Sequence, residues 1–530
     1  MSAPAGRRRR KPRAPVLHPL LLAGWPVLFL LAGNVQEARI GDALQALAVV
    51  VGVAAVATAG LGALLGSARR AGLVVSVAAV ALLAYGHVLT LAGDPPWLLP
   101  LWLAAAGAGM IAALRARGPL QGVTRAGNRL GLVLVAMSLP GIVLGARAGA
   151  QPEVAAEPTA QALSWQGPGP PRDVYFLVFD RYGSTDALRA QLGIDNAAFT
   201  GELESRGLQV LPDAVANHLR TPQSLASTLR MDYLLDLTDR YGTDTGDQRP
   251  LQALLADHRV GRLFQSAGYR HVHVGSWWDT TANNTSADQV LGYEGADRGG
   301  GSDFLEVLRD TSLLAALPED VEVGQLPLRV QHRDAALLQL EQIAAVADDP
   351  RPTFTFAHVL LPHEPYVFDA EGGAVSAEQA RQRPQAELFA DQLAFTNERI
   401  TGLLDSLLSG PADAQPIILL QADEGPHPPR SNAPGTDFTW PTATDEELLG
   451  KFGILNAWYV PAGLEVPVAR ARTPVNSFRV LFDALYGGRF QTLPERSYIF
   501  PDTEHLYDFI DVTARLRAAQ AAAAATSAVS

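Results

Sequence analysis

The chain has 530 residues, no cysteine, and 42 Lys and Arg against 54 Asp and Glu, a formal net charge of −12. The first 150 residues carry 14 basic and 3 acidic side chains, whereas the remainder carries 28 and 51. So acidic a C-terminal part argues against nucleic acid as a partner. It is stable without disulfide bonds, and about 350 residues are ample for a buried core.

Apolar segments dominate the N-terminal third of the chain, at about 16–34, 43–66, 71–93, 97–114 and 129–147. Each is about long enough to cross a bilayer core of ~30 Å as a helix. The first one has the basic start of a signal peptide, but four more segments follow it, which favours an uncleaved helix. We therefore expect a five-helix transmembrane domain over residues 1–147.

Basic residues alternate between the connections of these segments. They cluster in residues 7–13, at Arg69 and Arg70, and in residues 115–129, whereas the other two connections hold a single Arg. By the positive-inside rule, the N-terminus is cytoplasmic and the large C-terminal domain is extracytoplasmic. A composition rich in Ala, Gly and Arg is typical of a high-GC bacterial genome, which places the protein in a bacterial cell membrane.

The C-terminal part alternates between apolar strands and amphipathic helices. Residues 148–171 are rich in Ala, Pro and Gly and are expected to form a linker. The predicted strands are 173–180, 268–276, 353–360, 416–423 and 453–460, and the predicted helices are 222–236, 250–267, 333–347 and 386–409. This alternation predicts an α/β domain over 172–516, with a mostly parallel sheet between helices. We expect a long loop at 279–302 and a frayed Ala-rich tail at 517–530.

Two of these strands end in carboxylates. Asp180 follows the apolar run 174–179, and Asp423 and Glu424 follow 416–422. The carboxyl ends of parallel strands meet at one edge of a sheet, so these side chains are expected to converge. Three anionic carboxylates in one place require a cation, because like charges raise one another's pKa. Oxygen ligands of this kind suit a hard divalent metal, Mg²⁺ or Mn²⁺.

A threonine begins the predicted helix between the two strands. Thr221 followed by Pro222 is typical of a helix N-cap and first position, and helix N-termini favour phosphate or sulfate. Next to a metal, the Thr221 hydroxyl is a candidate nucleophile toward phosphorus. The alternative is that Thr221 only caps its helix.

The order of these motifs resembles the alkaline phosphatase/sulfatase superfamily. Five membrane helices before such a domain resemble the lipoteichoic acid synthase branch and the phosphoethanolamine transferases. The resemblance implies that Asp180, Thr221, Asp423 and Glu424 coordinate the metal and that Thr221 forms a covalent phospho-intermediate. It further implies that His363, in the segment 358–366, lies near the substrate. His358, at the end of a predicted strand, is a second candidate for substrate contact.

Two departures from that superfamily matter. Its late motif is usually Asp-His-Gly, whereas this chain reads Asp423-Glu424-Gly425, which makes the site harder and lowers the expectation of zinc. A formylglycine sulfatase needs a modified Cys or Ser at the position of Thr221, so that activity is not expected. His271 and His273 share one face of a predicted strand and are expected to be core residues rather than ligands.

The sequence thus predicts a membrane-anchored, metal-dependent phosphotransferase or phosphodiesterase. Its substrate would be a lipid head group or an envelope polymer, with water or a hydroxyl as the acceptor. The alternative is a catalytically silent envelope protein of the same fold that binds a partner or a glycan. A transporter is disfavoured because the apolar segments lack the intramembrane charges that mark a translocation path. The oligomeric state stays open.

Overall fold

The computed structural model describes residues 14–35, 40–92, 95–148, 163–292, 303–316, 328–346, 351–432 and 438–527. The chain divides into two compact units, residues 1–151 with 302–318, and residues 152–301 with 319–530. The N-terminal basic cluster, most of the predicted linker and the end of the predicted loop 279–302 lie outside the described residues.

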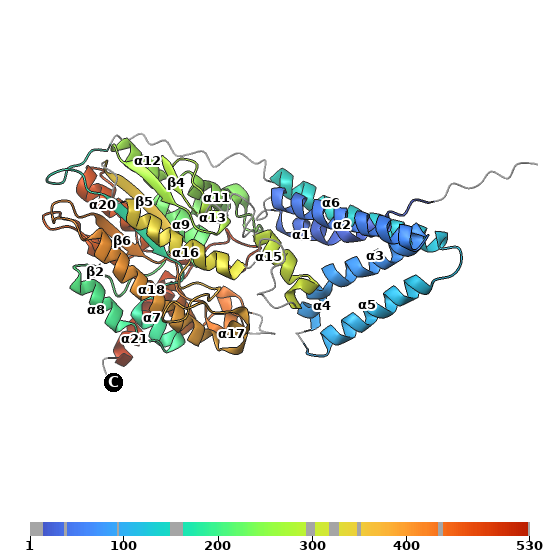
Figure 1. The fold of residues 1–530 in the computed structure, drawn as a ribbon. Helices are drawn as coiled ribbons and strands as arrows, with labels where there is room; N and C mark the ends of the chain where they lie inside the picture. Colours follow the sequence, from blue (N-terminus) through green and yellow to red (C-terminus); the bar gives the residue numbers. More distant parts are fainter. Residues whose placement is uncertain are drawn as a thin grey trace, which may run out of the picture. The chain divides into compact units, whose positions relative to one another are not determined.

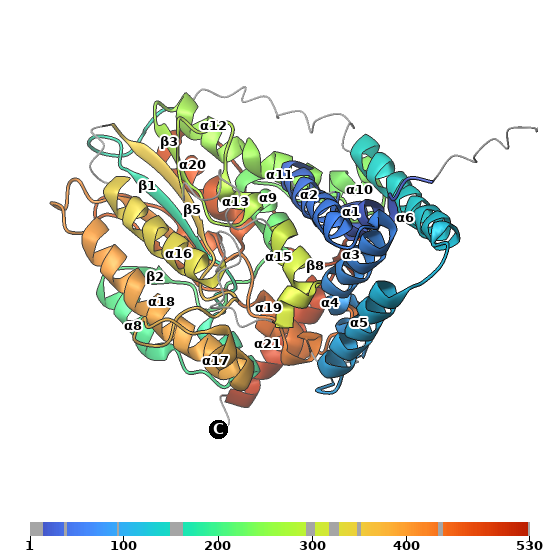
Figure 2. The same ribbon diagram turned by 45° about the vertical axis from the view of Figure 1, so that its right-hand side comes forward.

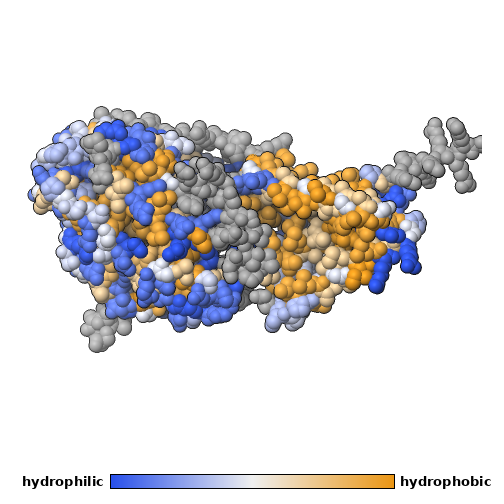
Figure 3. Space-filling model, viewed as in Figure 1, coloured by the Kyte–Doolittle hydropathy of each residue, from blue (hydrophilic) through white to orange (hydrophobic). Residues whose placement is uncertain are grey.

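The first unit contains apolar helices (Figure 1): α1 (His18–Asn34), α2 (Ile40–Leu64), α3 (Ala68–Leu83), α4 (Tyr85–Ala92), α5 (Leu98–Arg115) and α6 (Gln121–Ala148). Among the described residues, three stretches are long and apolar enough to cross a membrane, Ile40–Leu64, Leu98–Arg115 and Gln121–Gly145. Helix α1 is apolar but shorter, and the predicted third span is divided between α3 and α4. Apolar side chains cover much of the outside of this unit (Figure 3).

Helix α1 packs against α2, α3 and α6. Small residues allow the closest of these approaches, since a Cβ at Gly131 of α6 would lie 2.6 Å from Cβ of Leu21. Within a bilayer, the hydrophobic effect does not drive helices together, because lipid tails are as apolar as the side chains. Close van der Waals packing of this kind stabilises the association instead. Asn128 also accepts hydrogen bonds from the backbone N–H groups of Leu17 and His18, which fixes the start of α1 against α6.

The second unit contains a seven-stranded sheet in the order β2-β7-β6-β1-β5-β3-β4. Its strands are β1 (Val174–Phe179), β2 (Gln209–Val210), β3 (Arg270–Val274), β4 (Gln289–Leu291), β5 (Thr353–Val359), β6 (Ile417–Gln421) and β7 (Asn456–Tyr459). Strands β6, β1, β5, β3 and β4 run parallel, whereas β7 is antiparallel to β6 and to β2. The predicted α/β architecture with a mostly parallel sheet is therefore confirmed.

Helices cover both faces of this sheet (Figures 1 and 2). One face carries α16 (Leu328–Ala345) and α18 (Gln385–Leu407), and the other carries α9 (Thr221–Arg230), α12 (Arg259–Ser266) and α20 (Ser477–Tyr486). Phe264 of α12 stacks on Phe354 of β5 with ring centroids 4.3 Å apart, and Phe478 of α20 packs edge-on against Phe354. Buried aromatic pairs of this kind supply much of the free energy that holds helices to a sheet.

Shorter elements complete the second unit: α7 (Thr185–Leu192), α8 (Ala197–Ser205), α10 (Leu235–Tyr241), α11 (Arg249–Ala256), α13 (Asp279–Ala282), α17 (Ala377–Gln382), α19 (Asp445–Phe452), α21 (Thr513–Ser527), β8 (Tyr498–Ile499) and β9 (Ile510–Asp511). The first part of the predicted loop 279–302 thus holds α13 and β4. The Ala-rich segment is helical as far as Ser527, because Ala is the strongest helix former.

Two helices predicted as single elements are each divided. Met231 has a left-handed φ of 61° and ends α9, so that α10 starts anew at Leu235. The second division falls between α11 and α12, where the His258 side chain accepts a hydrogen bond from Gly261 N and caps α12. Local capping therefore overrides the longer amphipathic pattern at both places.

A group of buried histidines lies between β3 and α12. His258 and His271 meet edge to face with ring centroids 4.9 Å apart, and His273 packs on Phe356. A Cβ at Gly261 would lie 2.6 Å from the His271 ring, so glycine permits this contact. Burial lowers the pKa of His271 to about 3 and of His273 to about 4, and it holds the pKa of His258 well below its ordinary value.

These histidines predict a loss of stability in acid. Below pH 6.5 the unfolded chain binds more protons than the folded chain. The contribution of these histidines to the free energy of unfolding is therefore fully present above pH 6.5 and falls as the pH drops toward 4. Each histidine contributes about 1.4 kcal/mol per pH unit. His271→Leu should reduce the loss between pH 7.5 and 5.0 by about 2 kcal/mol, because about 1.5 pH units of this range lie below 6.5. Thermal unfolding of the full chain in detergent at the two pH values measures this.

The exposed His505 supplies the control for this measurement. Its ring pairs with Asp502, which raises its pKa, so His505→Gln should not reduce the loss of stability in acid. An unchanged pH dependence in His271→Leu would contradict the role assigned to the buried histidines.

Candidate metal centre and active site

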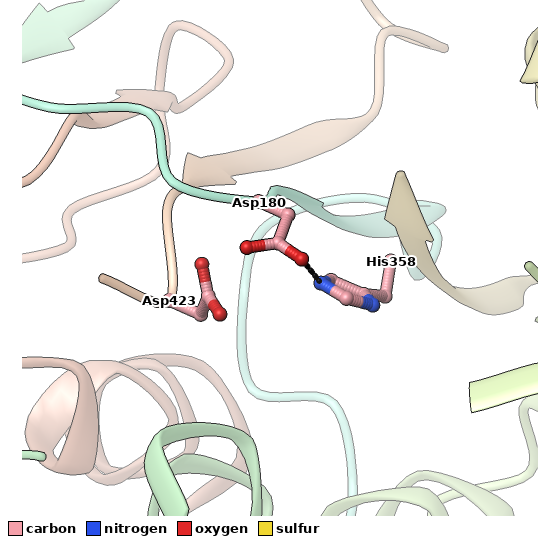
Figure 4. Close-up of side chains that lie close together, drawn as sticks. All are labelled: Asp180, His358 and Asp423. Atoms are coloured by element: carbon pink, nitrogen blue, oxygen red, sulfur yellow. Dashed lines mark ion pairs between the residues drawn. The ribbon is translucent and has the colours of Figure 1, made fainter. Parts of the chain in front are cut away.

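Three adjacent parallel strands bring Asp180, His358 and Asp423 together (Figure 4). Asp180 directly follows β1, His358 lies near the end of β5, and Asp423 comes two residues after β6. One ligand atom from each side chain lies within 4.8 Å of the others, and all three residues are buried. Nε2 of His358 lies 3.5 Å from Oδ2 of Asp180.

Several polar atoms of this group have no hydrogen-bond partner among the described residues: Oδ1 of Asp180, Oδ2 of Asp423 and Nε2 of His358. A buried polar atom without a partner carries a substantial desolvation penalty. Two carboxylates and an imidazole are also the donors that hold catalytic divalent metals in proteins. The residues present therefore fit a divalent cation, which would satisfy these atoms and balance the buried charge.

The Thr221 side chain lies beside the carboxylate of Asp423 and favours its charged form. Helix α9 begins at Thr221 with Arg220 in the N-cap position, because the Arg220 carbonyl accepts the first helical hydrogen bond from Ser224 N. The predicted N-cap role of Thr221 is therefore wrong by one residue. Ser224, one turn into the helix, donates its hydroxyl to the Asp423 carbonyl at 2.7 Å and fixes the helix start to the end of β6.

The two carboxylates of this group differ in acidity. Burial opposes ionisation of Asp180, but the charges of His363, His358 and Arg181 outweigh it and lower the pKa of this carboxyl. Burial and the charge of Asp180 raise the pKa of Asp423 to about 6. Of the two aspartates, Asp423 is therefore the weaker acid.

Arg181 holds the turn after β1 in place. Its φ is 60°, in the left-handed region that a residue with a side chain enters at some energetic penalty. In this conformation its backbone N–H donates to Oδ1 of Asp423 at 3.2 Å. Its guanidinium pairs with Glu364 at 2.6 Å. The backbone and the side chain of Arg181 thus each contact a carboxylate.

Glu424 lies beside this group but pairs with protein cations. Its Oε1 lies 2.7 Å from Nζ of Lys451 and 3.6 Å from Nε of Arg181, and both Glu424 and Lys451 are fully buried. Burial raises the pKa of Glu424 to about 7 even though Lys451 favours its charged form. Among the described residues, Glu424 is not part of the group formed by Asp180, His358 and Asp423.

Gly425 explains how Lys451 reaches this position. A Cβ at Gly425 would lie 2.2 Å from the carbonyl oxygen of Gly450 in α19, so only glycine admits the end of that helix. Gly425 N donates to the Lys451 carbonyl at 2.8 Å, and Lys451 Nζ donates to the Gly425 carbonyl at 3.0 Å. Nothing in the sequence pattern marks Lys451 as a partner of this motif, because α19 is a surface-type helix with acidic residues in its first turn.

Polar residues behind His358 fix its orientation. Its Nδ1 lies 3.0 Å from the hydroxyl of Thr281, which in turn lies 2.8 Å from the hydroxyl of Ser276. Gln339 donates to the His358 carbonyl at 2.9 Å. With Nδ1 so engaged, Nε2 is the atom directed at Asp180, the arrangement typical of histidine ligands in metal centres. The sequence predicted His358 only as a substrate contact.

His363 lies outside this group, on the segment that follows β5. It is half-buried, and its charge acts on Asp180, which places it near the carboxylates. Gln392 of α18 holds the segment by donating to the His363 carbonyl at 2.7 Å. The structure therefore brings Asp180, Thr221, Asp423 and His358 together, with Glu424 and His363 adjacent.

The pair of Lys451 and Glu424 yields a prediction for stability. Removing one partner of a buried ion pair leaves an uncompensated buried charge, which lowers the free energy of unfolding by about 3 kcal/mol. Lys451→Met should lower the free energy of unfolding by that amount at pH 8, and less at pH 6, where Glu424 takes up a proton. Denaturant unfolding of the full chain in detergent with a chelator measures both values.

The double variant Lys451→Met/Glu424→Gln is the matched control, since it removes both charges. It should recover at least half of the lost stability. An equal loss in the single and the double variant would show that the two charges do not compensate each other.

No protein-family model and no curated protein matches this chain. Solved structures that resemble it include the C-terminal periplasmic domain of EcEptC from Escherichia coli in complex with Zn, at 12% identity and a TM-score of 0.41, covering 66% of this chain and 94% of that one. The integral membrane protein lipooligosaccharide phosphoethanolamine transferase A (EptA) from Neisseria meningitidis has 12% identity and a TM-score of 0.37, with 84% and 88% covered.

A protein in the alkaline phosphatase superfamily from Vibrio parahaemolyticus also resembles it, at 12% identity and a TM-score of 0.36, with 62% and 73% covered. The solved structures that resemble this chain thus include phosphoethanolamine transferases, a protein of the alkaline phosphatase superfamily and a sulfatase.

Proposed function

We propose that the chain is a membrane-anchored, metal-dependent enzyme that transfers a phosphoryl or phosphodiester group from a lipid head group or an envelope polymer. The observation that carries this proposal is the meeting of Asp180, His358 and Asp423 in a buried group, with the Thr221 side chain beside Asp423. A nucleophile next to a carboxylate and a cation site is the arrangement that phosphoryl transfer requires.

Asp180, Asp423 and His358 would hold the metal, with Thr221 beside it. The bound cation would stabilise the negative charge that develops on the transferring group. Hard oxygen donors favour Mn²⁺ or Mg²⁺, while the imidazole of His358 makes Zn²⁺ a cation that must be compared directly. The family resemblance implies that Glu424 is a metal ligand. We propose instead that Glu424 stays paired with Lys451 and Arg181 and influences the metal site only through its charge.

The reaction would use side chains in three roles. Asp423 would position the Thr221 hydroxyl, whose proton would pass to solvent water as the threonine oxygen attacks phosphorus. The bond from Thr221 Oγ1 to phosphorus forms while the bond to the leaving oxygen breaks, and His363 protonates that oxygen. Water or an acceptor hydroxyl then attacks the phosphothreonine and releases Thr221.

The membrane unit would keep this site near its substrate. We propose five crossings, by α1, α2, α3 with α4, α5 and α6, with the N-terminus cytoplasmic and the second unit extracytoplasmic. The alternation of basic residues along the sequence supports this orientation. An enzyme of lipid head groups gains from such anchoring, because its substrate is confined to the same surface.

A silent binding protein of the same fold is the second candidate. The observation in its favour is that Lys451 and Arg181 already neutralise Glu424 without a metal. The two proposals differ over Asp180 and Asp423, whose unpartnered oxygens have no such protein cation within hydrogen-bond reach among the described residues.

The nucleophile is tested with Thr221→Val, which keeps the shape of the side chain and removes the hydroxyl. Hydrolysis of bis-p-nitrophenyl phosphate by the full chain in detergent with Mn²⁺ should fall by at least about 10³-fold. Thr221→Ser should retain measurable activity, and intact-mass analysis should find a phosphoryl adduct only when residue 221 carries a hydroxyl. Undiminished turnover in Thr221→Val would exclude Thr221 as the nucleophile.

The metal ligands are tested by calorimetric titration of Mn²⁺, Mg²⁺ and Zn²⁺. Asp423→Asn and Asp180→Asn should weaken binding by more than about 100-fold, since neighbouring residues that only support ligands contribute 10–100-fold. Glu424→Gln should weaken it less than either. Absence of binding by the unmodified chain would favour the silent protein, and a larger effect of Glu424→Gln would restore Glu424 as a ligand.

A further inference from the structure

A short segment from the second half of the sequence belongs to the first unit. Residues 303–316 form α15 (Asp303–Asp310) and the 3₁₀ turn η1 (Leu313–Ala316). In the sequence they come between β4 and α16, which both belong to the second unit, yet they pack with the membrane helices. We call residues 303–316 the insert.

The insert buries its apolar side against α1 and α2. Phe304 is only 3% exposed and lies in a cluster with Val27, Leu30, Leu31, Ala43 and Ala46. Leu305 and Leu308 pack at the edge of the same cluster. Val307, on the other side of α15, is 40% exposed. The helix is therefore amphipathic, and its apolar side is used within the first unit.

Backbone contacts tie the insert to the start of α4. Gly86 N donates a hydrogen bond to the carbonyl of Thr311 at 3.0 Å. A Cβ at Gly86 would lie 2.1 Å from the carbonyl oxygen of Asp310, so a larger residue would force the two backbones apart. η1 follows directly and packs against α3 and α4. Both a side-chain cluster and a close backbone approach thus define the contact.

We propose that the insert is a noncovalent anchor that binds the second unit to the chain's own helix bundle. The chain leaves the second unit after β4, contributes the insert to the first unit and returns at α16, so the two units should stay joined when the chain is cut within the predicted linker 148–171. This inference does not depend on the proposed enzymatic activity. It also predicts that a fragment starting at residue 172 exposes Phe304, Leu305 and Leu308 and aggregates.

The test uses the full chain in detergent, with a protease recognition sequence inserted within residues 149–162 and an affinity tag at the N-terminus. After cleavage, most of the C-terminal fragment should be recovered with the tagged helix bundle. If the N-terminal and C-terminal fragments separate although the insert is unmodified, the proposal is overturned.

Variants identify the contact. Phe304→Asp/Leu308→Asp should reduce recovery of the C-terminal fragment at least about tenfold, and Gly86→Leu should reduce it from the other side of the contact. Val307→Asp is the matched control, because it adds the same charge to the exposed side of α15 and should leave recovery unchanged. The released fragment should keep the thermal unfolding transition of the second unit. Equal recovery in all variants would show that the insert is not the anchor.

Discussion

The candidate site depends on the burial of negative charge. Asp180, Asp423 and Glu424 meet at one edge of the sheet with almost no access to solvent, and like charges so placed cannot all ionise without cations. Lys451 and Arg181 supply protein cations for Glu424, and one oxygen each of Asp180, Asp423 and Glu424 stays without a hydrogen-bond partner among the described residues. Protein cations thus compensate the charge of Glu424, whereas a bound metal would compensate the charges of Asp180 and Asp423. The proposed chemistry takes place at these metal-binding residues.

The sheet makes this arrangement possible. Strands β5, β1 and β6 are neighbours and run parallel, so residues that follow each of them share one edge. The hydrogen bond from Ser224 to the Asp423 carbonyl and the absent side chain of Gly425 then bring the starts and ends of helices to the same place. Small substitutions in these supporting residues would move Thr221 or Lys451 relative to the carboxylates without touching either.

Sequence patterns predicted the main strands and two of the site residues. The remaining features depend on long-range packing, which local sequence patterns do not reveal. Apolar runs that end in carboxylates predicted β1, β6 and the convergence of Asp180 with Asp423. The order of strands is a long-range property, so the pattern did not place His358 between Thr281 and Asp180. Lys451 lies at the end of an otherwise acidic helix, and α15 of the insert is an eight-residue amphipathic helix whose partner no local signal reveals.

The most direct test of the account is the position of a bound metal. Crystals of the full chain grown with Mn²⁺ and measured at the manganese absorption edge would locate it by anomalous scattering. The account predicts one peak within bonding distance of carboxylate oxygens of both Asp180 and Asp423, with Lys451 still paired to Glu424. A peak bonded to Glu424 with Lys451 displaced, or no peak at this edge of the sheet, would contradict it.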